Sequence, residues 1–460
     1  MRKKTLQQIA LALTGAFFWN LPAGACAELS IEQAVDMALQ QNTSLKITQK
    51  GENTAEAELR KAKGSRGFTV SATGGVNTKK INNEQRTDTG SADLSAKLPI
   101  YTGGKNEAAV ESGEIGLKSA VLSTDREREN VRLNVIKAYY DVLEAKRTVA
   151  VDQESVNNYE AHLNNVEQLY SAGSKARIDV LRSSVELSDA RQTLIKAQNT
   201  YEVNQATLRN ILNIDRNEPL TLTDDFAYVP FHSDMNSCIT YAYAHRKDLQ
   251  VDQYTLEQKK LAVTQAKAGF LPTLSLSLGT GLSDQLNAGG DNTHSYTAGL
   301  SASWNVFDSG VTRAAVDEAK TAQEVAALTL QKDQENVDLA VRQAYYNMRE
   351  AEKRFISTHD AVGKAQEDYF IAREKYRAGE GLMLDIIDAQ VALSKAQLNF
   401  ISAQYDYARY KATIENNVGL GITESAEQLP VAEDSAPVLP IDGMGANDAA
   451  SEAAQNGVTR

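Results

Sequence analysis

Apolar residues at helical spacing dominate the chain. No proline occurs between about residues 104 and 170, and two apolar stripes run side by side there. The first comprises Leu133, Ile136, Tyr140 and Leu143, and the second comprises Val135, Ala138 and Val142. A helix with two adjacent apolar stripes needs packing partners on both sides. At about 1.5 Å per residue, this helix would span roughly 100 Å.

Two shorter helices are expected beside this long one. The first covers about residues 31–66 and the second about residues 178–214, and their summed length is close to that of the long helix. The sequence therefore predicts that the two stack end to end along it.

Four segments alternate between apolar and polar residues. They cover residues 68–76, 92–100, 274–282 and 296–306. Each has about ten residues and one apolar face, the length and dyad pattern of a transmembrane β-strand. Half-buried strands of a soluble sheet show the same alternation, so this pattern alone leaves both possibilities open.

The chain contains an internal duplication with an offset of 206 residues after the strands and 204 before them. Matching positions are Gly104 and Gly310, Tyr170 and Tyr376, Gly173 and Gly379, Asp179 and Asp385, and, upstream, Ala38 and Ala242. A length change of two residues in one loop explains both offsets. We expect a first repeat at residues 28–214, a linker at 215–237 and a second repeat at 238–420, each with the order helix, strand, strand, long helix, turn, helix.

Four strands are too few for a closed barrel, since about eight is the lower limit, and open sheet edges cannot face lipid. Several chains must therefore share one barrel if the strands lie in a membrane. Three chains would contribute twelve strands and a ring of helices around a hollow centre.

The two ends of the chain differ from this pattern. Residues 1–27 have a basic start, an apolar run and small residues, as secretory signal peptides do. Cleavage after Ala27 is favoured, while lipidation of Cys26 is the alternative. Cleavage leaves Cys238 as the one cysteine, so no internal disulfide is expected. No later stretch has about 18 consecutive apolar residues, so no helical membrane span is expected. Residues 421–460 have the composition of a disordered acidic tail.

Composition and motifs narrow the function classes. The 460 residues carry a net charge of -12, which argues against a nucleic-acid partner. The five histidines are scattered, and neither a nucleotide-binding nor a hydrolase nor a metal-site motif occurs. We expect neither enzymatic activity nor a cofactor or metal. A periplasmic enzyme and a structural coiled-coil scaffold of the envelope remain the alternatives to a membrane duct.

Several segments carry a resemblance to a known family. They are "IEQAVDMALQQNTSL", "AKAGFLPTLSLS", "VFDSG", "AYY" and the turns "YSAGSKARIDVL" and "YRAGEGLMLDII". In this order they resemble the TolC-type outer-membrane efflux proteins over about residues 29–420. The resemblance implies a mainly α fold with membrane β-strands, in which a homotrimer forms a 12-stranded outer-membrane β-barrel continued by a periplasmic α-helical coiled-coil barrel. It also implies a passive exit duct that contacts outer-membrane lipid and docks with a periplasmic adaptor (membrane fusion) protein and an inner-membrane pump or ABC exporter.

The resemblance also assigns residues near the two turns. Asp385 and Asp388 match aspartates that form rings at the narrow periplasmic entrance, a field that attracts cations and hinders anions. Tyr376, Asp179 and Gln168 match positions that hold neighbouring helices closed. For Asp179 and Asp385, a carboxylate in the first helical turn that stabilises the helix start is the simpler interpretation.

Two departures from the family pattern leave the closing contacts incomplete. Gly381 stands where the family has an arginine, and Ile178 stands where it has a threonine. As a hypothesis, Arg182 faces Asp388, or two basic residues face Glu380, and this restores the pairing between the unlike turns. Those two basic residues are Lys175 and Arg177. The expected adaptor-docking positions at the tips are Gly173, Lys175, Arg177, Gly379, Glu380 and Gly381.

Overall fold

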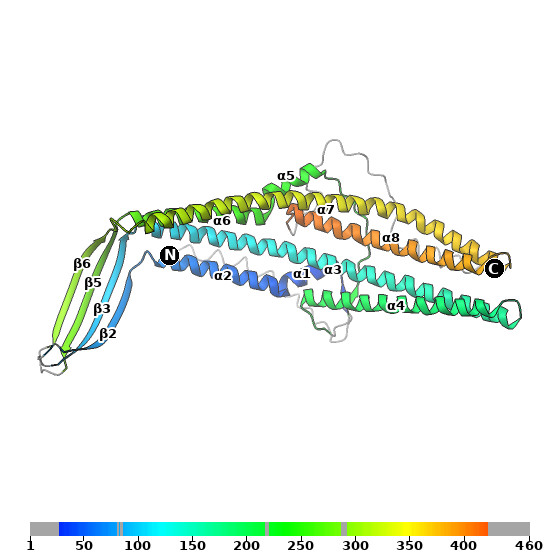
Figure 1. Cartoon of the computed structure of the whole chain (residues 1–460), viewed down its shortest axis with the longest axis horizontal. Coiled ribbons are helices and arrows are strands. Elements are labelled where there is room, and N and C mark those ends of the chain that lie inside the picture. Colours follow the sequence, from blue (N-terminus) through cyan, green and yellow to red (C-terminus); the bar gives the residue numbers. More distant parts are fainter. Residues whose placement is uncertain (1–26, 81, 83–85, 217–219, 287–291, 422–460) are drawn as a thin grey trace, which may run out of the picture.

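The computed structural model describes residues 27–80, 82, 86–216, 220–286 and 292–421. Cys26, nearly all of the expected signal peptide and all but the first residue of the expected tail lie outside the described residues. The molecule is an elongated bundle of helices with a β-sheet projecting from one end (Figure 1).

Two pairs of helices form the bundle and have identical lengths in the two halves of the chain. Helices α3 (Lys105–Ser171) and α7 (Val311–Arg377) have 67 residues each, and α4 (Arg177–Leu212) and α8 (Met383–Val418) have 36 each. Both long helices begin after a glycine with φ of 88°, at Gly104 and Gly310. This left-handed conformation favours glycine and turns the chain from the sheet into the helix.

The segment expected as one helix over residues 31–66 is two helices, so that expectation was wrong. Helix α1 (Ile31–Gln41) ends at Asn42, and α2 (Thr43–Gly64) begins there. The Asn42 Oδ1 atom accepts hydrogen bonds from the backbone N–H groups of Ser44 (2.9 Å) and Leu45 (3.3 Å), which caps α2 and interrupts the helix. Its Nδ2 donates to the carbonyl oxygen of Ile211 (3.0 Å), which joins this break to the last turn of α4.

The predicted end-to-end stacking is confirmed by this junction, since α2 and α4 both pack along α3 (Figure 1). The second half repeats the arrangement with α5 (Met235–His245) and α6 (Lys247–Lys267), followed by the 3-10 helix η1 (Ala268–Phe270).

The sheet contains four antiparallel strands in the order β2-β3-β5-β6. Their bounds are Thr69–Lys79 for β2, Thr87–Tyr101 for β3, Thr273–Gln285 for β5 and Thr293–Ser303 for β6. The last strand begins and ends three residues earlier than expected. Its early end coincides with Trp304, whose indole Nε1 donates to the carbonyl oxygen of Phe270 (3.0 Å). A separate parallel pair joins β1 (Ala27–Leu29) to β4 (Leu220–Leu222).

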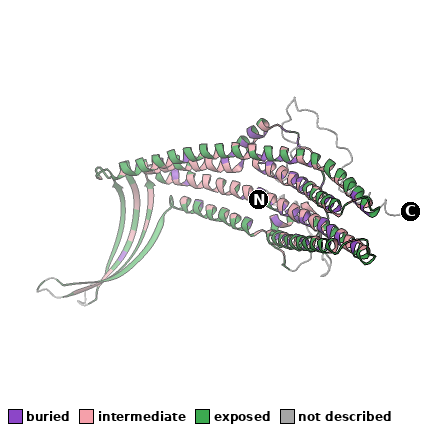
Figure 2. Ribbon diagram, turned by 45° about the vertical axis from the view of Figure 1, so that its right-hand side comes forward, coloured by how far each residue is buried: buried purple, intermediate pink, exposed green. Residues whose placement is uncertain are grey.

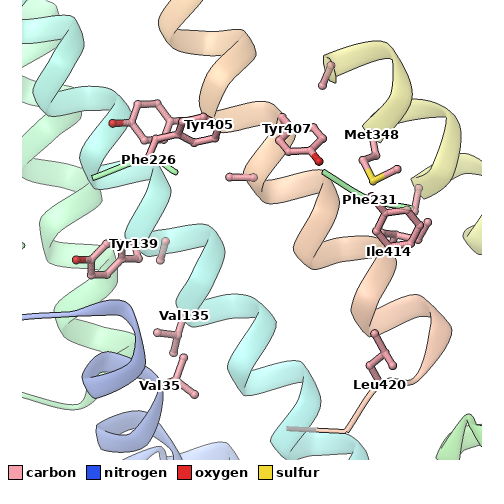
Figure 3. Packing of buried hydrophobic residues seen from close by; sticks show 14 of the residues in the cluster. Val35, Val135, Tyr139, Phe226, Phe231, Met348, Tyr405, Tyr407, Ile414 and Leu420 are labelled. Carbon is pink, nitrogen blue, oxygen red and sulfur yellow. The ribbon is translucent and has the colours of Figure 1, made fainter. Parts of the chain in front are cut away.

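The largest apolar core lies at the middle of the bundle. It gathers buried side chains from α1, α3, α7, α8 and the linker, among them Val35, Tyr139, Phe231, Met348 and Tyr407 (Figure 3). The edge strands β2 and β6, in contrast, expose their side chains throughout, whereas the inner strands β3 and β5 alternate between exposed and partly buried positions (Figure 2). No helix of the described ranges is long and apolar enough to cross a membrane.

Candidate functional site

The sheet has two chemically different faces. Apolar side chains of neighbouring strands share one face because the register pairs Ala72 with Leu94 and Leu276 with Leu300. Most of the large apolar side chains there are exposed; they include Val70, Val76, Leu94, Leu278, Leu282, Tyr296 and Leu300. The opposite face carries hydroxyl pairs across the strands, such as Ser71 with Ser95 (Oγ to Oγ 2.9 Å). One face therefore suits a hydrocarbon environment, and the other suits water.

The two turns at the opposite end of the bundle have the same backbone geometry. Gly173 (φ 75°) donates to the carbonyl oxygen of Tyr170 (2.9 Å), and Gly379 (φ 80°) donates to that of Tyr376 (3.0 Å). Both glycines therefore supply a positive φ at a helix C-terminus, the conformation that favours glycine there.

Asp179 and Asp385 both stabilise the helix that follows the turn. The Oδ2 atom of Asp179 accepts a hydrogen bond from the backbone N–H of Ala176 (3.3 Å), and Asp385 accepts from Leu382 in the same way (3.0 Å). A carboxylate in the first turn also interacts favourably with the helix dipole. The capping interpretation therefore explains both aspartates within one chain, whereas the exposed Asp388 has no such contact to the turn.

Gly381 occupies a position where a side chain has little room. A Cβ atom added there would lie 2.9 Å from the backbone nitrogen of Tyr376 and 3.1 Å from the carbonyl carbon of Lys375. The Gly381 N–H also donates to the Lys375 carbonyl oxygen (3.0 Å). The turn folds tightly onto the end of α7, which gives a local reason for glycine here.

None of the ion pairs among the described residues joins Arg182 to Asp388, or Lys175 or Arg177 to Glu380. The Lys175 Nζ atom lies 4.3 Å from the centre of the Tyr376 ring, at cation–π distance. Within one chain, the two tips therefore meet through an aromatic ring rather than through paired charges. Gln168 is exposed, and its carbonyl oxygen accepts from the Ser171 hydroxyl (2.7 Å).

His162 is a tip residue to which the sequence assigned no role. Its ring lies 5.5 Å from that of Tyr376, which is 3% exposed. The His162 Nε2 atom and the Tyr376 hydroxyl are both buried without a hydrogen-bond partner among the residues that the structure describes. Burial, reinforced by the charge of Lys175, lowers the pKa of His162. A lone histidine within a long helix gave no pattern from which this contact could be predicted.

Polar side chains connect the two hairpins of one chain above the tips. The Ser155 and Ser394 hydroxyls lie 2.7 Å apart, and Asn158 donates to Gln390 Oε1 (3.1 Å). Gln390 is buried and also donates to Ser394 Oγ (3.1 Å). These hydrogen bonds join α3 to α8, a pairing that the repeat pattern did not predict.

The described part of the chain contains neither a cluster of metal ligands nor a reactive thiol. No group of three or more His, Cys, Asp or Glu side chains there is arranged to hold a metal ion. Cys238 is buried, and burial raises the pKa of its thiol to about 12, so it stays protonated at neutral pH.

Comparisons with known proteins give a consistent result. The family model for outer membrane efflux proteins matches residues 34–213 and 239–420. The outer membrane protein TolC of Escherichia coli is 22% identical over 342 residues, which cover 72% of this chain and 69% of TolC. The toluene efflux pump outer membrane protein TtgC of Pseudomonas putida is 22% identical over 87% of this chain and 84% of its own. The crystal structure of the CmeC outer membrane channel of Campylobacter jejuni superposes with a TM-score of 0.77 at 19% identity, covering 86% of this chain and 87% of CmeC.

Proposed function

The chain belongs to the outer membrane efflux protein family, and on this basis we propose that it is a passive exit duct of a tripartite efflux pump or a type I secretion system. The resemblance predicted from the sequence is confirmed. The protein is an outer-membrane channel protein that extends into the periplasm, and it is not an enzyme.

The observation that carries the duct proposal is the four-stranded sheet with an exposed apolar face. In the described chain, β2 and β6 each pair with a neighbour on one side only. Unpaired backbone groups cannot face hydrocarbon, so these edges need further strands. Three copies would supply twelve strands, an even number within the range of outer-membrane barrels, which begins at about eight. The hydroxyl-rich face would then line the interior.

The duplication supports a ring of three copies. Ile401 on α8 is 8% exposed, whereas its counterpart Ile195 on α4 is 65% exposed. Tyr140 on α3 is half-buried, whereas its counterpart Tyr346 on α7 is 59% exposed. The contact between α3 and α8 is therefore made inside the chain, and the equivalent α7 and α4 faces remain open. We propose that they meet between neighbouring copies and close a ring of six hairpins.

The tips are proposed to form the gate. Asp385 and Asp388 would give two rings of three carboxylates, which attract cations and hinder anions. Tyr376, Asp179, Gln168 and Arg182 are proposed as the latch, with Arg182 facing Asp388, or Lys175 and Arg177 facing Glu380, across neighbouring copies. Exposed pairs of this kind contribute only about 0–1 kcal/mol each, so a docking partner could separate them.

The remaining assignments follow from the same proposal. Residues 1–27 act as the signal peptide that directs export, and the strands contact outer-membrane lipid. The six tip positions named from the sequence dock with a periplasmic adaptor, which connects the duct to an inner-membrane pump or ABC exporter. The homotrimer needs no cofactor, since a passive duct carries out no chemical step.

Planar-bilayer conductance tests the duct and its latch. The purified parent protein should form pores of low conductance, and both Arg182→Ser and Asp388→Ala should raise the closed-state conductance because each removes one side of the latch. Arg191→Ser is the matched control, since Arg191 is an exposed arginine of α4 that pairs with Glu160. Absence of pores with the parent protein would contradict the duct, and unchanged conductance in both variants would contradict the pairing of Arg182 with Asp388.

A further inference from the structure

The α3–α8 contact contains a charge pair whose repeat counterpart has reversed signs. Arg132 on α3 and Glu415 on α8 line one recess together with Ile136 and Leu420. Burial raises the pKa of Glu415, while Lys411 and Arg132 oppose that rise through their positive charges. The two opposite charges therefore lie in one recess inside the chain, where the Arg132 guanidinium also donates to the carbonyl oxygen of Gly421 (3.3 Å).

The duplication maps this pair onto the open faces. The counterpart of Arg132, 206 residues later, is Asp338 on α7, and the counterpart of Glu415, 206 residues earlier, is Arg209 on α4. Both members of the pair are exchanged in sign, so the two positions remain complementary. Asp338 forms an ion pair with Arg342 on its own helix (2.7 Å), and Arg209 donates to Gln205 (2.8 Å). A contact with another copy would add to these interactions.

A second contact of the same junction points to the same register. Arg126 on α3 donates to the carbonyl oxygen of Asn416 in the last turn of α8 (3.0 Å). The repeat counterparts are the exposed Lys332 on α7 and Asn210 in the last turn of α4. A junction between α7 and α4 of different copies in this register would again place a basic side chain against an asparagine at a helix C-terminus, where a cation is favourable.

We propose that Asp338 of one copy pairs with Arg209 of the next, and that the reversed signs sort the hairpins so that the two kinds alternate around the ring. This inference rests on the proposed trimer. The correct junctions place Arg132 against Glu415 and Asp338 against Arg209. Between hairpins of different copies, the two incorrect junctions are α3 with the other copy's α4 and α7 with the other copy's α8. These would place two arginines or two carboxylates together. Like charges at the same position make the incorrect junction less stable than the correct one, and this difference in stability gives the interface its specificity.

The consequence is a rule for assembly. Two similar hairpins from one duplicated chain could otherwise associate with their own kind across copies, which would leave a ring with mismatched strands. The charge exchange makes the open α7 face complementary to α4 of a neighbouring copy and repulsive to α8 of that copy. The partner that fits this surface is therefore a second copy of the same chain, in one orientation.

A charge-reversal cycle in the full-length, membrane-extracted protein tests the pairing. Asp338→Arg and Arg209→Asp should each speed subunit dissociation by about tenfold or more, because each places like charges together. The double variant should dissociate within about threefold of the parent rate. The coupling between the two changes excludes the separate effect of losing the Asp338–Arg342 ion pair, because that loss occurs in both variants that carry Asp338→Arg. The matched control is Arg191→Asp, a charge reversal at an exposed arginine of α4 that pairs with Glu160 on α3, and its dissociation rate should stay within about threefold of the parent.

Cysteine cross-linking gives the register directly. A chain with Asp338→Cys and Arg209→Cys should form oxidised species up to the trimer, whereas Asp338→Cys with Gln205→Cys, one turn away, should cross-link far less. Rescue in the double reversal together with this cross-link supports the proposal. A trimeric parent without rescue, or with preferential cross-linking through position 205, overturns the pairing and leaves the duct standing. A parent extracted as a monomer overturns both.

Discussion

At the scale of single residues, the tip contains a titratable group at the contact between the two hairpins. His162 packs against the Tyr376 ring, and the Lys175 ammonium lies over the same ring. Protonated His162 would place a second positive charge in this cluster, in a site that offers its Nε2 no acceptor. Neutral His162 is therefore the form that fits the packed tip.

This arrangement predicts that acid loosens the tip. Because the pKa of His162 is lowered from 6.5 in the folded chain, the unfolded chain binds the proton more readily. The stabilisation from neutral His162 is complete above pH 6.5. It is lost as the pH falls from 6.5 towards the pKa of the folded state, and in that window the folding equilibrium constant changes by up to about tenfold per pH unit. Hydrogen exchange of the amides around Val166 and Tyr376 should accelerate accordingly.

The control variants separate this residue from general acid effects. His162→Phe keeps a ring at the contact and should remove most of the acid-induced acceleration. His294→Phe, on strand β6, should leave it unchanged. Equal acid sensitivity in the His162→Phe variant and the parent would show that another group controls the tip.

The residues that could be predicted at the tips are those with a local reason for their identity. Gly173 and Gly379 supply a positive φ, and Asp179 and Asp385 cap the following helix, so nearby sequence was sufficient. His162, in contrast, depends on a neighbour more than 200 positions away in the sequence. Such contacts have no signature in a short window of sequence.

At the scale of elements, one buried tyrosine joins three segments of the chain. The Tyr139 hydroxyl donates to the carbonyl oxygen of Leu29 (2.9 Å) and accepts from the backbone N–H of Asp224 (3.2 Å). The Asp224 carboxylate in turn accepts from the N–H of Ile31 (2.6 Å), at the start of α1. Helix α3 thereby fixes the N-terminal strand, the linker and α1 together.

Tyr139→Phe should therefore destabilise the protomer by about 1–3 kcal/mol, since it leaves two backbone groups without their partner. Guanidinium unfolding of the detergent-solubilised protein, followed by circular dichroism, measures the change. Tyr345→Phe is the matched control at the equivalent repeat position, where the hydroxyl accepts one long contact from Arg349 Nε (3.3 Å). Its expected cost is below about 1 kcal/mol. Equal losses in the two variants would refute the role of the three-segment contact.

The positions of most helices and strands were predicted from the periodicity of apolar residues. The long helices begin and end within a residue or two of the expected positions, because the apolar stripes and the glycines agree. The break at Asn42 was missed because the apolar period continues across it, although its capping hydrogen bonds to Ser44 and Leu45 are local. The contact with Ile211 that joins this break to α4 is distant in sequence. The early end of β6 depends on the contact of Trp304 with Phe270, again between separate elements.

At the scale of the whole molecule, the single chain is asymmetric in a way that defines its assembly. Its two halves have the same elements, yet the α3 and α8 faces are covered and the α7 and α4 faces are open. The sheet likewise ends in two unpaired edges among the described strands. Both features support the proposed ring of identical copies, in which three copies with four strands each give twelve strands.

Cryo-electron microscopy of the full-length protein in lipid nanodiscs tests this account most directly. The account predicts a three-fold complex in which β6 of one copy pairs with β2 of the next and α7 packs against the neighbour's α4, around one continuous lumen that narrows at the tips. A monomer with open sheet edges, or a closed assembly in which α7 contacts α8 of the neighbouring copy, would contradict it.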